Sequence, residues 1–268
     1  MTLGRYYRAS LLGWGMGLLL AANAVFAEPQ EDLIDAAIDG DAADVAAAVE
    51  AGADVNEPYK GGWTPLMVAG ELNSAEVVKK LLEEGADVGA RREATGFTPL
   101  MVAAEHNDAA VVQALVDAGA DTEARDNKGW TALMLAAAWN EPAVAKALID
   151  AGADLEARSD GGSTALIFAA RKNDAAMVKA LIEGGAEVNA PNKVGITSLM
   201  AASYSNTPEV VSLLLESGAD PTITDRHDYT AADWGKRNSR VHDTPVYYTM
   251  RDAEEEARKQ EEAQEEEG

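Results

Sequence analysis

The residue types that most often carry catalysis or bind metals are scarce in this sequence. It has no cysteine, and its three histidines, His106, His227 and His242, lie far apart along the chain. Without cysteine there is no disulfide, thiolate nucleophile or zinc finger, and the histidine spacing matches no metal-binding or catalytic motif. A phosphate-binding G-x-x-x-x-G-K-[ST] loop and a nucleophile elbow are also missing. We therefore expect a protein that is not an enzyme and that needs no cofactor or metal.

Carboxylates, in contrast, are abundant. The chain holds 46 acidic residues and has a formal net charge of −24, so pairs of carboxylates are expected from composition alone. Such pairs are weak evidence for acid–base chemistry, and cation binding stays open only as an alternative in turns such as that of Asp225 and Asp228. A strongly acidic surface repels nucleic acids and anionic membranes and favours basic patches on a partner. We expect a protein partner, no nucleic acid and no membrane once the chain is exported.

The N-terminus has the features of an export signal. Arg5 and Arg8 precede an apolar run from Ser10 to Ala22, and Ala24-Val25-Phe26-Ala27 places small residues at the −3 and −1 positions of a cleavage site. The apolar run is shorter than the roughly 20 residues of a membrane span. The sequence thus predicts a signal peptide over residues 1–27, cleaved after Ala27, and a periplasmic or secreted protein. An uncleaved anchor is the alternative.

Two short markers recur along the rest of the chain. A Thr-x-Leu tripeptide returns at spacings of 34, 33, 33 and 33 residues, beginning at Thr64, Thr98, Thr131, Thr164 and Thr197. A Gly-Ala-Asp/Glu tripeptide keeps the same period, beginning at Gly52, Gly85, Gly119, Gly152, Gly185 and Gly218. Two independent markers with one period indicate internal repeats. The single extra residue falls between Gly85 and Thr98, where we expect a loop at 91–95 to absorb it.

Each unit predicts a pair of helices. In the unit 96–128, Thr98 is a candidate N-cap and Pro99 suits the first helical turn. Asn107 is expected to end the first helix in the left-handed conformation, as are Asn73, Asn140, Asn173, Asn206 and, in the first unit, Gly40. The second helix carries an apolar stripe, Val111, Val112, Leu115 and Val116, and ends at Gly119. Because one unit cannot bury this stripe alone, neighbouring units must stack as a solenoid.

This pattern resembles the ankyrin repeat. The family's G-x-T-P-L-H-x-A-A start is matched in the segments that begin at Gly62, Gly96, Gly129, Gly162 and Gly195. The resemblance spans residues 31–243 and implies an all-α solenoid of stacked helix-turn-helix units with hairpin-like loops. The family's histidine is replaced by Met67, Met101, Met134, Ile167 and Met200, where we expect apolar packing and no histidine hydrogen-bond ladder. Such Thr-x-Leu-Met variants resemble bacterial, exported members.

The repeat markers predict the domain boundaries. We expect about five full repeats at 62–227, divided as 62–95, 96–128, 129–161, 162–194 and 195–227. An N-terminal capping repeat covers 28–61 and a C-terminal one covers 228–243. The remainder, 244–268, is an acidic tail, and 252–268 alone contains nine acidic and two basic residues. We expect that tail to be largely disordered, with an exposed helix as the alternative.

The resemblance also implies where a partner binds. Ankyrin proteins usually bind on a concave face built from the hairpin tips and the exposed positions of each first helix. Mapped onto this sequence, that face consists of Trp63, Glu71, Leu72, Phe97, Glu105, His106, Trp130, Trp139, Arg171, Lys172, Ile196, Tyr204 and Tyr229. Only 6% of the chain is aromatic, so this concentration of rings predicts interface anchors. The alternative is that the rings cover the hairpin backbone.

These observations favour an exported binding module or scaffold, monomeric by itself, that holds a protein partner. A secreted effector or stress-protective factor acting on a host or envelope protein is the alternative. An enzyme with an active site improvised on the solenoid has no positive support in the sequence.

Overall fold

The computed structural model describes residues 28–267, apart from 73, 107–108, 140–141 and 173–174. The predicted signal peptide therefore lies outside the described residues. Seven first helices are formed by α2 (Pro29–Asp39), α4 (Pro65–Glu71), α6 (Pro99–His106), α8 (Ala132–Trp139), α10 (Ala165–Lys172), α12 (Ser198–Ser205) and α14 (Ala231–Gly235). Six second helices are formed by α3 (Ala42–Glu50), α5 (Ala75–Glu83), α7 (Ala109–Asp117), α9 (Pro142–Asp150), α11 (Ala175–Glu183) and α13 (Pro208–Glu216). The last helix is α15 (Pro245–Glu267).

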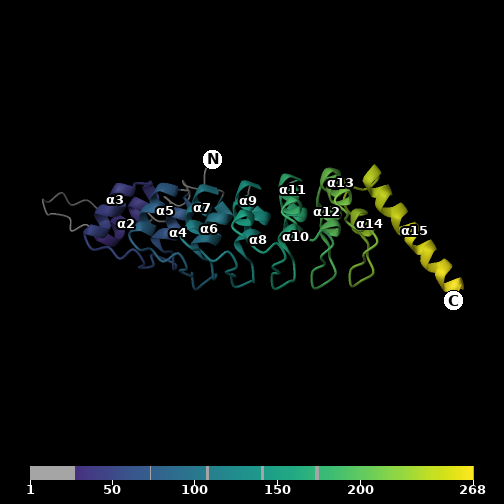
Figure 1. Cartoon of the computed structure of the whole chain (residues 1–268), viewed down its shortest axis with the longest axis horizontal. Helices are drawn as coiled ribbons and strands as arrows, with labels where there is room; N and C mark the ends of the chain where they lie inside the picture. Colours follow the sequence, from purple (N-terminus) through teal and green to yellow (C-terminus); the bar gives the residue numbers. More distant parts are fainter. Residues whose placement is uncertain (1–27, 73, 107–108, 140–141, 173–174, 268) are drawn as a thin grey trace, which may run out of the picture.

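The helices are arranged in two rows. Each first helix packs against the next first helix, and each second helix packs against the next second helix. Hairpin-like loops extend beyond the row of first helices (Figure 1). The described residues contain no β-strand, and one isolated bridge joins Tyr59 to Trp63. The all-α solenoid expected from the sequence is thus confirmed.

The Thr-x-x-Met spacing that recurs between the repeats explains how the first helices begin. Thr64, in an extended conformation, accepts a hydrogen bond from the Met67 amide at 3.3 Å, and Pro65 follows at the first helical position. Thr131 accepts the same bond from Met134 at 3.4 Å. The methionine side chains are fully buried, as expected for apolar packing in place of histidine. One continuous core extends from Leu33 to Met250 because every pair of helices buries its stripe against its neighbours.

The loops are joined to one another without histidine. At the hairpin tips the amides of Asp160 and Lys193 donate to the carbonyls of Lys128 and Gly161, at 3.1 and 3.2 Å, one repeat back. Arginine side chains add a second set of bonds, and the Arg158 Nη1 lies 2.6 Å from the Pro191 carbonyl oxygen in the next loop. The backbone and the arginines therefore bridge adjacent loops.

The extra residue of the second repeat lies in a hairpin turn, as the sequence predicts for the loop at 91–95. The other hairpins close over five residues, as in Asp126 N–H to Trp130 carbonyl at 2.9 Å. In this hairpin the Arg92 amide donates to Phe97 at 2.9 Å, so six residues are enclosed. The insertion sits in the turn, and the helix stacking on either side continues.

The left-handed helix end that we expected at asparagine is wrong for Asn206. Its backbone is extended, with φ −108° and ψ −173°, whereas Gly40 is left-handed as expected, with φ 79° and ψ 24°. The buried Asn206 side chain instead donates to the Ala170 carbonyl, at 2.7 Å, and so connects α12 to the previous repeat. The extended backbone of Asn206 directs its side chain toward the previous repeat, where this hydrogen bond forms. The equivalent Asn73, Asn107, Asn140 and Asn173 lie outside the described residues.

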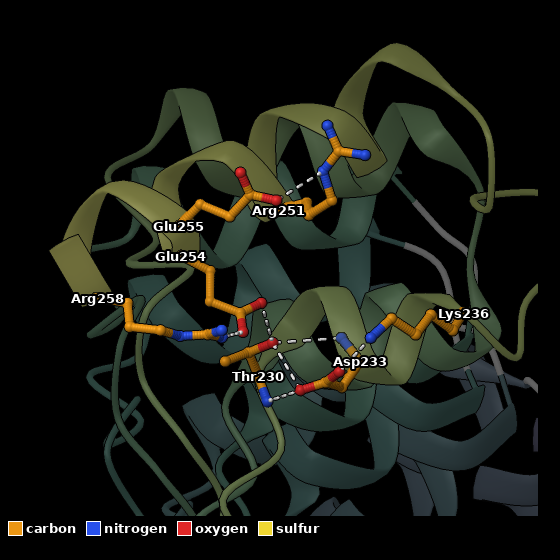
Figure 2. A network of polar contacts seen from close by, with 7 residues as sticks. All are labelled: Thr230, Asp233, Lys236, Arg251, Glu254, Glu255 and Arg258. Carbon is orange, nitrogen blue, oxygen red and sulfur yellow. Dashed lines mark hydrogen bonds and ion pairs between the residues drawn. The ribbon is translucent and has the colours of Figure 1, made fainter.

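The segment after the repeats differs from our expectation of a largely disordered tail. Residues 245–267 form one helix, α15, and its Tyr247 and Met250 side chains are buried against the last repeat. The Glu254 Oε2 lies 3.1 Å from the hydroxyl of Thr230, the N-cap of α14, and Arg258 holds the other Glu254 oxygen at 2.8 Å (Figure 2). The C-terminal cap therefore extends past the boundary that we drew at 243. Apolar residues after this boundary cover the end of the core, which would otherwise be exposed.

Candidate protein-binding face

In the first helices from α4 to α12, most residues that are not buried lie in the last turn. In α8, residues 132–138 are buried and Trp139 is 56% exposed; in α12, residues 198–203 are buried and Tyr204 is 48% exposed. The reason is geometric, since each of these helices has a neighbouring first helix on both sides and a second helix behind it. We call the half-buried and exposed residues at the ends of the first helices, including those just after α4 and α14, the helix-end row; it consists of Glu71, Leu72, Glu105, His106, Trp139, Arg171, Lys172, Tyr204 and Arg237.

The rings at the hairpins are largely structural. Trp63, Phe97 and Trp130 are half-buried, and the latter two pack against the core. The Trp130 ring lies 4.2 Å from that of Phe168, between centroids, and the Arg92 guanidinium lies 4.9 Å from the Trp63 centroid. These contacts agree with the alternative that the rings cover the hairpins. Ile196 is half-buried in the same way, while Tyr229 is 46% exposed.

In the middle of the helix-end row, two repeats meet through an aromatic ring and a cation. The Lys172 Nζ at the end of α10 lies 3.8 Å from the centroid of the Trp139 ring at the end of α8. A cation over an indole face at this distance is attracted by the ring quadrupole. The Ser205 hydroxyl then donates to the Arg171 carbonyl at 2.9 Å, which joins α12 to α10. The predicted residues Trp139, Arg171 and Lys172 therefore lie together.

The C-terminal end of the face is an aromatic cluster. Tyr204 and Tyr229 both lie nearly perpendicular to Trp234, with centroids 5.4 and 6.4 Å away and interplanar angles of 89° and 84°. Sequence reasoning missed Trp234 because the last unit lacks most of the repeat pattern. The Thr230-Ala231-Ala232 start could have identified it, since it places Trp234 on a first helix. A small hollow beside the cluster is lined by Tyr229, Asp233, Trp234, Lys236 and Arg237.

Asp225, where cation binding was left open, has a structural role. Its buried carboxylate accepts hydrogen bonds from the backbone amides of His227 and Tyr229 at 2.8 and 3.1 Å. The Trp234 indole N–H donates to the other oxygen at 3.2 Å. These bonds close the last hairpin and position Trp234. In the described part of the chain, no three His, Asp or Glu side chains converge as a metal site requires.

At the end of the cluster, a paired carboxylate fixes the start of α14. Burial raises the pKa of Asp233, but hydrogen bonds from Lys236, at 2.6 Å, and from Thr230 outweigh burial and hold that pKa below its ordinary value. The Thr230 and Asp233 side chains form a reciprocal capping box. The network of Figure 2 thus joins the start of α14 to α15 through the contact between Thr230 and Glu254.

The repeats and the all-helical solenoid agree with comparisons with known proteins. The family described as "Ankyrin repeats (3 copies)" matches residues 90–159 and 151–225, and "Ankyrin repeat" matches residues 61–93. The crystal structure of the ankyrin repeat domain of Bcl-3, described as a unique member of the IkappaB protein family, is similar with a TM-score of 0.67 and 30% identity. That similarity covers 79% of this chain and 96% of the Bcl-3 chain.

A curated mouse protein, "Ankyrin repeat, SAM and basic leucine zipper domain-containing protein 1" of Mus musculus, is 33% identical over 81 residues. The match covers 28% of this chain and 17% of the mouse protein. Family matches that cover more than half of the chain, together with the repeat geometry, lead to one conclusion. The chain belongs to the ankyrin-repeat family.

Proposed function

We propose that this chain holds a protein partner on the face formed by the helix-end row and Tyr229, which corresponds to the concave face of the family. Ankyrin repeats imply a protein–protein interaction module and are typical of non-enzymatic scaffolds. The observation that carries the proposal is the exposure of Trp139 on α8, Tyr204 on α12 and Tyr229 in the last hairpin. Large exposed rings at neighbouring positions are typical interface anchors, because they bury much apolar area at little entropic cost.

We further propose that the protein acts outside the cytoplasm. This rests on the N-terminal sequence, whose basic start, apolar run and Ala27 boundary have the order of a cleavable signal. Within the described residues, no helix is both long and apolar enough to cross a membrane. Mass measurement of the protein recovered from its host should give a chain that begins at Glu28. A chain that keeps residues 1–27 would contradict cleavage, and fractionation would separate a periplasmic from a secreted location.

The binding face can be tested by photocrosslinking in the cell that produces the protein. A photoreactive phenylalanine analogue replaces Trp139 or Tyr204, and each should form a discrete adduct with the same partner. Tyr248 provides the matched control, because it is an exposed aromatic residue on α15, which is not one of the first helices that form this face. Adducts at Tyr248 but not at Trp139 and Tyr204 would contradict the proposed site.

Purified variants then measure the energetic role of the rings. Trp139→Ala with Tyr204→Ala should weaken the crosslinked partner's binding by about 30-fold to several hundredfold, as expected for two anchor residues of roughly 1–2 kcal/mol each. Tyr248→Ala should leave binding unchanged. We prefer this pair to Trp130→Ala, because Trp130 packs against Phe168 and its removal would also disturb the repeats. Unchanged binding by the double variant would overturn the proposal.

A further inference from the structure

We propose that the helix-end row recognises a partner segment with opposite charges at its two ends, cationic over α4 and α6 and anionic over α10 and α14. This inference rests on the proposed function, because it describes the partner of that same face. It concerns the order of charges along the row, which the presence of exposed rings does not determine.

The charge changes sign along one register position. The residues seven positions after the repeated threonine are Glu71, Glu105, Ala138, Arg171, Tyr204 and Arg237, the last of which lies in the turn after α14. The acidic members lie in the N-terminal half of the solenoid and the basic members lie in the C-terminal half. The adjacent position adds Lys172 to the basic half. Because each first helix packs on the next, the sequence order of these residues is also their spatial order.

These charges are not neutralised by one another. Arg171 and Arg237 are exposed, Glu71 and Glu105 are half-buried, and among the described residues none of the four has an ion pair. The second helices differ, since Lys80 pairs with Glu84 at 2.6 Å and Lys146 pairs with Asp150 at 2.7 Å, one turn away in each case. The row therefore presents charges that remain available to a partner.

The net charge of the chain makes the basic half distinctive. On a protein of net charge −24, a wholly anionic partner is repelled and a wholly cationic partner can bind at many places. A segment with both signs gains from both halves in one register and is repelled at both ends in the reverse register. Complementary charges of this kind contribute mainly to orientation and specificity.

The spacing sets the length of the segment. Glu105 on α6 and Arg171 on α10 are separated by α8, so they are two helix-packing steps, or roughly 16–20 Å, apart. An extended chain covers this distance in about five or six residues at roughly 3.3 Å each. Trp139, with Lys172 over its ring, lies between the two ends. The segment that fits has a basic end, an apolar or aromatic centre and an acidic end.

A peptide selection tests the inference. A random library of peptides long enough to span the row is selected on immobilised chain 28–268 and, separately, on a variant with Glu71→Lys, Glu105→Lys, Arg171→Glu and Arg237→Glu. Circular dichroism confirms that the variant keeps its helices. Peptides enriched on the unaltered chain should carry basic and acidic residues at opposite ends, and the variant should enrich the reverse order. Exchanging the two kinds of peptide should weaken binding on the order of tenfold.

Controls separate this inference from the proposed function. Lys146→Glu with Asp150→Lys reverses an exposed ion pair on α9 and should leave the enriched charge order unchanged. If enriched peptides require Trp139 and Tyr204 but show no charge order, or keep their order on the reversed variant, the inference is wrong and the binding face stands. If enriched peptides bind equally well without both rings, or if no peptide is enriched, the proposed face fails and the inference fails with it.

Discussion

At the residue scale, the threonine before each first helix links a local hydrogen bond to the continuous core. The Thr131 side chain is buried and caps the amide of Met134, whose side chain fills the space between neighbouring helices. The same arrangement at Thr64, Thr98 and Thr197 shows why the repeat tolerates proline, alanine or serine at the next position but keeps threonine.

Replacing this cap should weaken the whole chain. Thr131→Ala leaves the Met134 amide without its side-chain acceptor and should lower the free energy of unfolding by about 1–2 kcal/mol. Thr131→Ser keeps the hydroxyl and should lose less. Urea denaturation of both variants, followed by circular dichroism, measures the difference. Equal losses would show that the hydroxyl does not act as a cap.

Asp233 should make stability depend on pH. Its pKa is lowered in the folded chain from 3.8, so the ionised carboxylate favours folding above that value and loses this contribution as the pH falls through the folded pKa. Asp233→Asn should lower stability at pH 7 by about 1 kcal/mol, and the deficit should shrink as the medium is acidified below pH 3.8. Thermal melts of both chains across this range provide the measurement. A deficit that persists unchanged in acid would contradict the ionic explanation.

At the element scale, neighbouring hairpins pack closely against one another. A Cβ added to Gly162 would lie 2.7 Å from the backbone nitrogen of Lys193 in the next hairpin, whereas a Cβ on Gly152 would meet nothing within 4 Å. Both glycines have left-handed φ values, 79° and 85°. Gly152 is thus needed only for its left-handed backbone conformation. Gly162 is needed for that conformation and also for the close contact with the next hairpin.

This pair of glycines separates strain from stacking. Gly152→Ala should cost about 1–2 kcal/mol for the left-handed conformation alone. Gly162→Ala should cost more than Gly152→Ala, because the backbone of the next hairpin must also move. Denaturant unfolding compares the two variants. A loss at Gly162 equal to that at Gly152 would mean that the hairpins can separate freely.

At the scale of the whole molecule, stability depends on the ends. Each repeat contacts only its neighbours, so an uncovered terminal repeat exposes apolar surface and frays. In Figure 1, α15 crosses the end of the solenoid beyond α13 and α14. The Ser203 hydroxyl donates to the sulfur of the buried Met250, with 3.4 Å between oxygen and sulfur. This contact connects the final helix to α12.

Loss of this contact should destabilise the C-terminal repeats more than the distant ones. Met250→Ala should destabilise the C-terminal repeats by about 2–5 kcal/mol through the cavity that it leaves. Amide hydrogen exchange should accelerate in α12 and α14 much more than in α6, because the effect spreads only between neighbours. Tyr248→Ala, on the exposed side of α15, is the control. Uniform acceleration along the chain would show that the solenoid unfolds as a single unit.

Much of this architecture could be predicted from the sequence for one reason. A repeat of 33 residues places each cap, turn and apolar stripe in the same local environment, so one unit explains five. The positions of Thr98, Met101 and Trp139 followed directly. The Asn206 conformation did not, because its side chain bonds to Ala170 in the previous repeat, and no local rule for helix ends includes that partner.

The sequence by itself determined the helix pairs, the order of the repeats and the register that brings Arg171 in line with Glu105. Tertiary structure alone decided which rings are exposed, because burial depends on the neighbour on each side: Trp130 packs on Phe168 whereas Trp139 extends beyond the last buried turn. It also decided that α15 covers the end of the core. Local patterns specify helices through near contacts, but exposure and capping arise only when distant segments pack together.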